Sequence, residues 1–495
     1  MSTPSKPTDP ALIRLEDVSL GGGAPPPRRF DLLRTPLLGR LLRARNGRLL
    51  LQIPFLLVAL LLVYDGLTGP QLAPQNLATV TVWIHTRGLV VLAALLLGNV
   101  FCMGCPFTLP RTLARRLSGR GRRWPQALRN KWLAVAAFVA FLFLYEWLDL
   151  WSGPRLTAAV IIGYFVGAFA LEALFAESPF CKYICPLGTF NFVANTAAPT
   201  QITVRNRDVC RACPGKECVN GSARVLGCGT ELFPPTVRSN LDCVFCLDCA
   251  RACPYDNVAL AIRRPGNEWT TGAPGAPNDG AWPRRWDVSF LVLVFAFTAV
   301  SNAFGMVPPF YDAQAWLAEA LGLTSEGGRL ALTFGALNLA LPAAAGLAAA
   351  ALSRVLAGRR EPLRVAFSRF APAFAPLAVA IWLAHYGFHF ATGALVIVPV
   401  LQNFLLAHGL TALGATPNWS LAAILPGNWL LPLQTAAVLA GFAVALFAGN
   451  RIARRDFDDP ATAARALLPW LVVLLALALA ALATFNLPME MRGLS

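Results

Sequence analysis

Four cysteines in the segment CVFCLDCARACP have the spacing most specific for one chemistry. Cys243, Cys246, Cys249 and Cys253 follow the pattern C-x2-C-x2-C-x3-C-P, in which three close thiolates hold one face of an iron–sulfur cubane and the fourth reaches a neighbouring cluster. The alternative is zinc, whose sites usually use two separated cysteine pairs. The spacing therefore predicts an iron–sulfur site.

Four further cysteines precede this motif in the same polar stretch. The segment CRACPGKEC, followed by Cys228, has looser spacing. In two-cluster ferredoxins the last cysteine of a motif binds the other cluster. We therefore expect two 4Fe–4S clusters, one held by Cys210, Cys213, Cys218 and Cys253 and the other by Cys228, Cys243, Cys246 and Cys249. The insertion between Cys218 and Cys228 leaves other assignments of the second set open.

The remaining four cysteines form a crude internal repeat. Twice, a pair of apolar segments ends in an aromatic residue, a cysteine, a short gap and Cys-Pro: FCMGCP contains Cys102 and Cys105, and FCKYICP contains Cys181 and Cys185. Three interpretations stay open, namely a third 4Fe–4S cluster, a redox-active thiol or copper site, and inert packing at a helix end. Soft sulfur suits Cu(I), and the paired spacing favours a reactive role over packing.

The elements that must position these cysteines are membrane spans. The chain has 495 residues, of which 56% are apolar and 14% charged, against about 25% charged residues in soluble domains. Long apolar runs predict a mainly α, polytopic helical membrane bundle of about nine spans with an inserted cytoplasmic two-cluster ferredoxin-like module. The predicted spans are 48–66, 79–101, 132–152, 157–176, 287–306, 330–352, 371–393, 429–449 and 467–486.

Basic residues in the loops orient this bundle. We interpret the net charge of +16 as a sign of membrane orientation and not of nucleic-acid binding, because cytoplasmic loops collect arginine and lysine. The loop 65–76 has no basic residue, whereas the segments before the first span and after the second contain Arg40, Arg43, Arg45, Arg48, Arg111, Arg115, Arg116, Arg120, Arg122, Arg123, Arg129 and Lys131. The N-terminus and all the cysteines are thus predicted to be cytoplasmic, in a bacterial-type inner membrane.

The same signals divide the chain. The polar N-terminus lacks the apolar core of a signal peptide, so we expect a cytoplasmic tail over 1–47. A four-span redox domain (48–176), a ferredoxin-like domain (177–285) and a C-terminal membrane domain of about five spans (286–495) follow. Treating 395–412 as a half-membrane or surface helix satisfies the charge rule and places the C-terminus outside.

Together these motifs resemble the NapH/NosR-like membrane polyferredoxins, over about residues 48–265. The resemblance is specific at FCKYICPLG and CVFCLDCARACP and weaker at FCMGCP, whose gap is two residues where the family usually has three. It implies electron transfer between the quinone pool and other redox proteins, as in quinol dehydrogenases, with clusters on the cytoplasmic side. Relatives that act in cytochrome oxidase assembly imply copper reduction. The last five spans lie outside the resemblance.

Ionisable residues inside the predicted spans are further candidates, because charge at membrane depth is costly. His85 and Arg87 in the second span and Glu146 and Asp149 in the third could form a quinone site, since such a site needs groups that bond the ring oxygens and accept protons. The alternative is that Arg87 pairs with Glu146 or Asp149 and stabilises the bundle.

Three of the four histidines lie in the C-terminal half. His385 and His389 are four residues apart and so share one helix face, and His408 is expected on the same external side. Imidazole suits haem b, copper and zinc, so these three histidines are candidate metal ligands or quinone contacts. The alternative is that they are hydrogen-bonded residues at helix interfaces.

We therefore predict an integral-membrane iron–sulfur oxidoreductase or electron carrier. It would move electrons between the quinone pool, or another membrane redox partner, and cytoplasmic 4Fe–4S clusters, with membrane lipid and other redox proteins as partners and no nucleic acid. One alternative is a copper or metal reductase or oxidase assembly factor. Another is a transporter or sensor that its clusters regulate.

Overall fold

The computed structural model describes residues 30–44, 46–110, 114, 121–222, 225–270 and 285–489. The predicted tail up to residue 29 lies outside the described residues. So do five of the loop arginines used for orientation, which are Arg45, Arg111, Arg115, Arg116 and Arg120.

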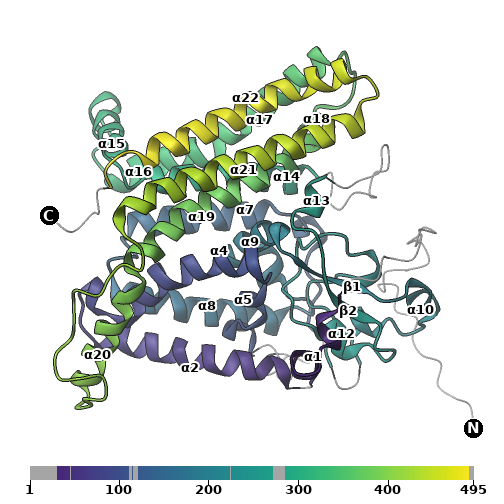
Figure 1. The fold of residues 1–495 in the computed structure, drawn as a ribbon. Helices are drawn as coiled ribbons and strands as arrows, with labels where there is room; N and C mark the ends of the chain where they lie inside the picture. Colours follow the sequence, from purple (N-terminus) through teal and green to yellow (C-terminus); the bar gives the residue numbers. More distant parts are fainter. Residues whose placement is uncertain are drawn as a thin grey trace, which may run out of the picture.

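Long apolar helices make up most of the molecule and lie side by side between the same two ends (Figure 1). Among the described residues, eight helices or helical runs are long and apolar enough to cross a membrane, and the shorter apolar helix α7 (Trp132–Trp147) joins them. Such runs fold as helices because a helix in lipid satisfies its own backbone hydrogen bonds. The predicted polytopic helical membrane bundle is confirmed.

Five of the eight are single helices, and three are runs interrupted by a π or 3-10 turn. The single helices are α2 (Gly47–Thr68), α8 (Pro154–Leu174), α14 (Trp286–Phe304), α21 (Gly427–Asp456) and α22 (Pro460–Phe485). The runs are α3–η4–α4 (Leu77–Thr79, Val80–Thr86, Arg87–Leu96), α16–η10–α17 (Glu326–Gly335, Ala336–Ala340, Leu341–Leu356) and α18–η11–α19–η12–α20 (Leu363–Phe370, Ala371–Ala373, Phe374–Gly393, Ala394–Val396, Ile397–Ala407).

A small cysteine-bearing module lies at one end of the bundle, which we call the cysteine end (Figure 1). Its strands β1 (Thr200–Val204) and β2 (Val258–Ile262) pair antiparallel, with Thr200 opposite Ile262. Its helices are α9 (Pro186–Ala194), α10 (Arg207–Ala212), α11 (Glu217–Asn220), α12 (Asp248–Ala252) and α13 (Asn267–Thr270).

The segment before the first span is fastened to this module. It contains η2 (Leu32–Arg34) and α1 (Leu38–Arg43). The backbone oxygen of Phe30 accepts a hydrogen bond from Ile262 N–H at 3.0 Å, and Asp31 forms an ion pair with Arg205 at 2.7 Å. The first span therefore starts at the cysteine end.

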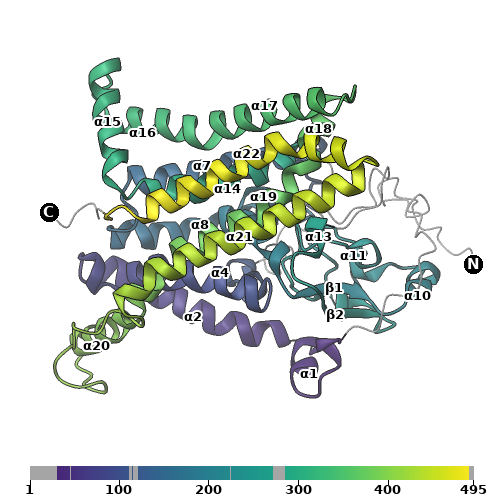
Figure 2. The same ribbon diagram turned by 45° about the horizontal axis from the view of Figure 1, so that its top comes forward.

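The ambiguous segment 395–412 forms α20, which bends away from α19 at the end opposite to the cysteines (Figure 2). Val400 is fully buried there against the ends of α2 and α3, in a cluster that includes Leu62 and Leu77. The helix does not cross the bundle, and α21 starts again from the same end. α22 consequently finishes opposite to the module (Figure 1).

One hydrophobic core joins the two halves of the bundle. α14 runs through its middle, and 83% of its most apolar stretch is buried. Phe138 of α7 packs on Phe295 of α14, and Phe190 of α9 packs on Trp382 of α19. The predicted redox domain and C-terminal membrane domain are thus segments of one chain that share one core.

The close approach of α4 and α19 allows the packing between the two halves of the bundle to be tested. A Cβ at Gly88 would lie 2.4 Å from Cβ of Phe390, whereas a Cβ at Gly163 in α8 would meet no atom within 4 Å. We expect Gly88→Ala to lower the free energy of unfolding by about 1–3 kcal/mol, because overpacking forces the helices apart. Gly163→Ala should leave it unchanged or raise it. Thermal unfolding of both variants in detergent measures this, and equal melting temperatures would contradict it.

Candidate functional site

Four cysteines of the module line one open hollow, which Phe233, Pro234 and Tyr255 help to wall. This first cysteine group consists of Cys210, Cys213, Cys218 and Cys253. The side-chain amide of Asn257 donates to Cys210 Sγ at 3.1 Å, and its backbone N–H donates to Cys253 Sγ at 3.4 Å. Burial and repulsion from the other three thiolates raise the pKa of Cys218 to about 12. A hollow lined by four sulfurs, two of which accept N–H bonds, fits an iron–sulfur cluster.

A second group lies deeper, beside α12. It consists of Cys228, Cys243, Cys246 and Cys249. Burial raises the pKa of both Cys243 and Cys249, and repulsion from the thiolate of Cys228 raises it further. Leu232 N–H donates to Cys228 Sγ at 3.3 Å. The four sulfurs therefore act on one another as one group.

The backbone between 242 and 247 is shaped for this group. Asp242, Phe245 and Leu247 have φ angles of 65°, 52° and 60°, which cost a non-glycine residue about 1–3 kcal/mol each unless the surroundings impose them. Alternating right- and left-handed residues turn successive N–H groups toward one side, a geometry found around iron–sulfur and phosphate sites. The loop thus forms a cradle that fits a cluster.

The first and second groups adjoin. The thiolate of Cys218 is close enough to that of Cys249 to repel it. Cys253 lies with the first group although its motif belongs to the second, and Cys228 lies with the second. This is the division predicted from exchanged ligands, and the binding of clusters stays a prediction. Among the described residues, no three His, Cys, Asp or Glu side chains are close enough together to hold one metal ion. A cubane does not require this, since each thiolate binds a different iron atom.

The two Cys-Pro repeats meet in a third group. Cys102 lies on α5 (Val100–Met103), and Cys181 lies on the π-helix η7 (Phe180–Ile184). Burial raises the pKa of Cys102, with added repulsion from Cys105 and Cys185, and Cys181 is repelled by all three. The side-chain amide of Asn191 donates to Cys102 Sγ at 3.4 Å.

Both Cys-Pro turns place the cysteine at the N-cap of a short helix. Cys105 precedes η5 (Pro106–Thr108) and Cys185 precedes α9. Proline suits the first helical position because it needs no N–H partner, and Gly188 N–H donates to Cys185 Sγ at 3.2 Å. Burial nevertheless raises the pKa of Cys185 to about 12. The thiols become thiolates only where a bound metal or cluster supplies positive charge.

Inside the bundle, Arg87 lies in an aromatic cage. Its guanidinium carbon is 4.1 Å from the ring centre of Tyr145, 4.8 Å from Trp83 and 5.2 Å from Tyr386, and it interacts electrostatically with Glu146. Cation–π contacts of this kind are worth about 2 kcal/mol or more when desolvated. Tyr145 and Tyr386, which the sequence did not single out, adjoin the predicted residues Glu146 and His385.

The other predicted intramembrane residues lie in four separate places. His385 is fully buried and its Nε2 lies 3.1 Å from Nε2 of His389, facing Arg87. His85 instead hydrogen-bonds the backbone oxygens of Val80 and Ala394. His408 lies at the end of the bundle opposite to the cysteines, where it bonds the Tyr64 hydroxyl at 3.0 Å. Asp149 lies in the turn after α7. The structure therefore joins Arg87 and Glu146 to the His385–His389 pair, and not to His85 or His408.

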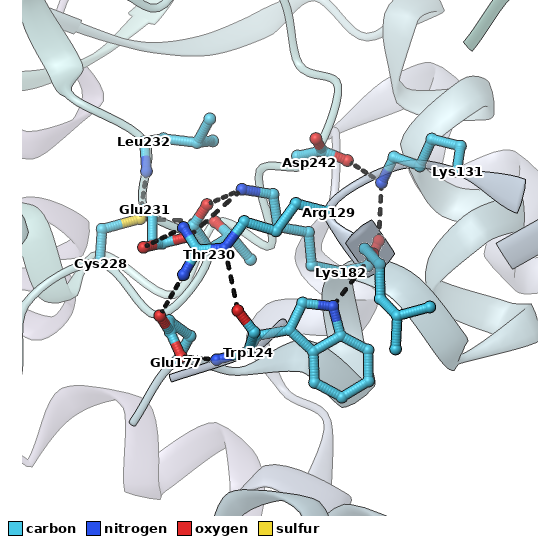
Figure 3. Close-up of polar contacts among 11 residues, drawn as sticks. Trp124, Arg129, Lys131, Glu177, Lys182, Cys228, Thr230, Glu231, Leu232 and Asp242 are labelled. Atoms are coloured by element: carbon cyan, nitrogen blue, oxygen red, sulfur yellow. Dashed lines mark hydrogen bonds and ion pairs between the residues drawn. The ribbon is translucent and has the colours of Figure 1, made fainter. Parts of the chain in front are cut away.

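A partly buried polar network that includes Lys131, Lys182 and Asp242 lies beside Cys228 of the second group (Figure 3). Lys182, between Cys181 and Cys185, donates to the backbone oxygen of Thr230 at 2.6 Å. Lys131 pairs with Asp242, next to Cys243. Burial opposes ionisation of Asp242, but Lys131 and Lys182 hold its pKa below the usual value. The network places two lysines where they offset the negative charge of thiolates.

Comparison with known proteins gives one relative. The chain is similar to the ferredoxin-type protein NapH of Escherichia coli (strain K12), with 26% identity over 229 residues, which are 42% of this chain and 77% of NapH. No protein-family model and no solved structure matches the chain. The similarity supports a distant NapH-like relationship for the matched part.

The cysteine groups lead to a test by metal analysis. We expect Cys246→Ser to remove about four of the irons bound by the first two groups, because a cubane loses its hold when one thiolate is replaced. Iron and acid-labile sulfide are measured on anaerobically purified protein. Cys213→Ser should remove the other set, and each variant should keep the EPR signal of the remaining cluster. If either single variant abolished all iron, the two-site assignment would be wrong.

Proposed function

We propose that this protein is an integral-membrane iron–sulfur electron-transfer protein that moves electrons between the quinone pool and redox partners on the cysteine side. The observation that carries the proposal is the contiguity of the three cysteine groups. The third group lies at the ends of the spans, and Asn99 bonds one cysteine of it and one of the second group. The first group adjoins the second and opens at the surface of the module. The similarity to a ferredoxin-type protein agrees with this function.

The first and second groups would hold one 4Fe–4S cluster each, which when bound supplies one-electron storage. The chain's own residues hold sulfur in place and donate N–H bonds to it, as Asn257 and Leu232 do. Hydrogen bonds and burial of this kind set cluster potentials over a wide range. The protein therefore controls the potential through its backbone and buried charges.

The third group would be the membrane-side centre of the relay. Four buried or half-buried sulfurs, two of them with N–H donors, suit a third cubane, and they also suit copper bound by soft thiolates. We favour a cubane over copper, because two loops supply four thiolates here, as in the other two groups. Copper supports the second candidate function, a metal reductase or oxidase assembly factor that reduces Cu(II) with electrons from the clusters.

Quinol oxidation requires groups that bind the ring oxygens and take up two protons while two electrons leave. The buried cluster around Arg87 supplies such groups, which are Tyr145, Glu146, Tyr386 and the His385–His389 pair. Nδ1 of His385 is buried and has no hydrogen-bond partner among the described residues, although buried polar atoms are normally bonded. The two histidines share one helix and contact each other, so a haem iron between them is a less suitable occupant than a quinone.

The orientation in a bacterial-type cytoplasmic membrane follows from charge. At the cysteine end, the described loops carry Arg123, Arg129, Arg359 and Arg360, and the last turn of α21 carries Arg454 and Arg455. The described segment 69–76 at the opposite end carries no basic residue. Basic loops stay in the cytoplasm. The clusters would then face the cytoplasm, and α22 would end outside.

Quinol-driven reduction tests the proposed function. In proteoliposomes, duroquinol should reduce the clusters, as followed by low-temperature EPR. Arg87→Gln should slow this reduction about tenfold or more, because a bond to a charged group is worth about 1.5–3 kcal/mol. Arg155→Gln, at the exposed start of α8, is the matched control. Clusters that duroquinol leaves oxidised, and that Cu(II) oxidises after chemical reduction, would favour the metal reductase.

A further inference from the structure

One buried side chain connects the third cysteine group to the second. Asn99 is 1% exposed and caps α5. Its side-chain oxygen accepts a hydrogen bond from Cys102 N–H at 3.3 Å, and its side-chain nitrogen donates to the backbone oxygen of Cys243 at 2.9 Å. A single amide therefore touches one cysteine of each group.

The backbone before Asn99 lies close against the second group. Gly98 has a φ of 98°, and a Cβ there would lie 2.6 Å from the Phe245 ring and 2.5 Å from Thr200 Oγ1. Phe245, which lies between Cys243 and Cys246, is 1% exposed. Only glycine permits this contact, so the joint is tightly packed.

Arg48 makes a second connection nearby. Its Nε donates to the backbone oxygen of Met103 at 3.0 Å, between Cys102 and Cys105. Its Nη1 lies 3.8 Å from a carboxylate oxygen of Asp248, between Cys246 and Cys249. The side chain is 13% exposed, so its charge acts on both groups with little screening.

We propose that Asn99 and Arg48 form the joint at which electrons cross between the third cysteine group and the second, with Asn99 as a positioning residue and Arg48 as a shared countercharge. The inference rests on the proposed function and deepens it. One electron leaves the centre on one side and reduces the centre on the other. No proton moves, because the amide and the guanidinium keep their protons in both states.

Asn99→Ser tests the joint. Serine keeps the N-cap but is too short to reach Cys243, and it adds no charge. In proteoliposomes with duroquinol, we expect reduction of the clusters of the first and second groups to slow by about tenfold or more, as is usual when a residue that supports metal ligands is replaced. Iron content and the EPR spectrum after dithionite should equal those of the unaltered protein.

Asn76→Ser is the matched control. Asn76 is also fully buried, caps α3 and donates to remote backbone oxygens, those of Asp65 and Pro70, but it lies at the opposite end. Its variant should reduce at the unaltered rate. Equal rates for Asn99→Ser and the unaltered protein would overturn the joint and leave the proposed function standing. Failure of duroquinol to reduce the unaltered protein would overturn both.

Arg48→Gln tests the countercharge independently of rate. Loss of a buried positive charge should lower the midpoint potential of the second cluster in an EPR-monitored titration, because the reduced cluster carries one more negative charge. Arg43→Gln, which removes an exposed arginine paired with Asp256, should leave that potential unchanged. Equal potentials for Arg48→Gln and the unaltered protein would overturn the role of Arg48.

Discussion

The crowding of the cysteine sulfurs into three groups is the constraint on which the rest of the cysteine end depends. All 12 cysteines are free of disulfides, and their groups are crowded enough for thiolates to repel one another. Such groups persist as ligands only when positive charge and N–H donors surround them. Lys131, Lys182 and Arg48 supply that charge, and the left-handed turns at Asp242, Phe245 and Leu247 supply the backbone geometry.

The C-terminal spans share the core of the N-terminal spans and do not form a separate, appended domain. α14 and α19 fill the core against α4, α7 and α9, and α19 contributes Tyr386, His385 and His389 to the surroundings of Arg87. An arginine at this depth is tolerable only where aromatic rings and a carboxylate replace its water. The polar cluster therefore needs both halves, although the resemblance to known polyferredoxins covers only the first.

The features that can be predicted from the sequence are those with a signal in a short stretch of residues. Apolar runs predict the spans, and cysteine spacing predicts the division of Cys228 and Cys253 between groups that the structure also makes. Helices that are apolar on all sides, such as α7, carry no periodic stripe to show which face meets which neighbour. Asn99, Arg48 and Tyr386 were therefore missed, since only tertiary packing brings them to the cysteines or to Arg87. His408 is expected from the sequence on the same external side as His385 and His389, but only the structure shows that the bend at η12 leaves it on α20, where it bonds Tyr64.

The chemical character of the joint between the third and second groups bears on how a relay can work beside a membrane. Charge that moves in a medium of low dielectric constant is opposed by any group that must reorient or ionise in response. Asn99 is neutral and is held by bonds at both ends of its amide, while Arg48 keeps its charge and is fixed by Met103 and Thr108. Neither group needs to change its protonation when an electron passes. Under the proposed function, protons would be taken up in the interior around Arg87 and electrons would pass through the sulfurs, so the two products of quinol oxidation would be separated in space.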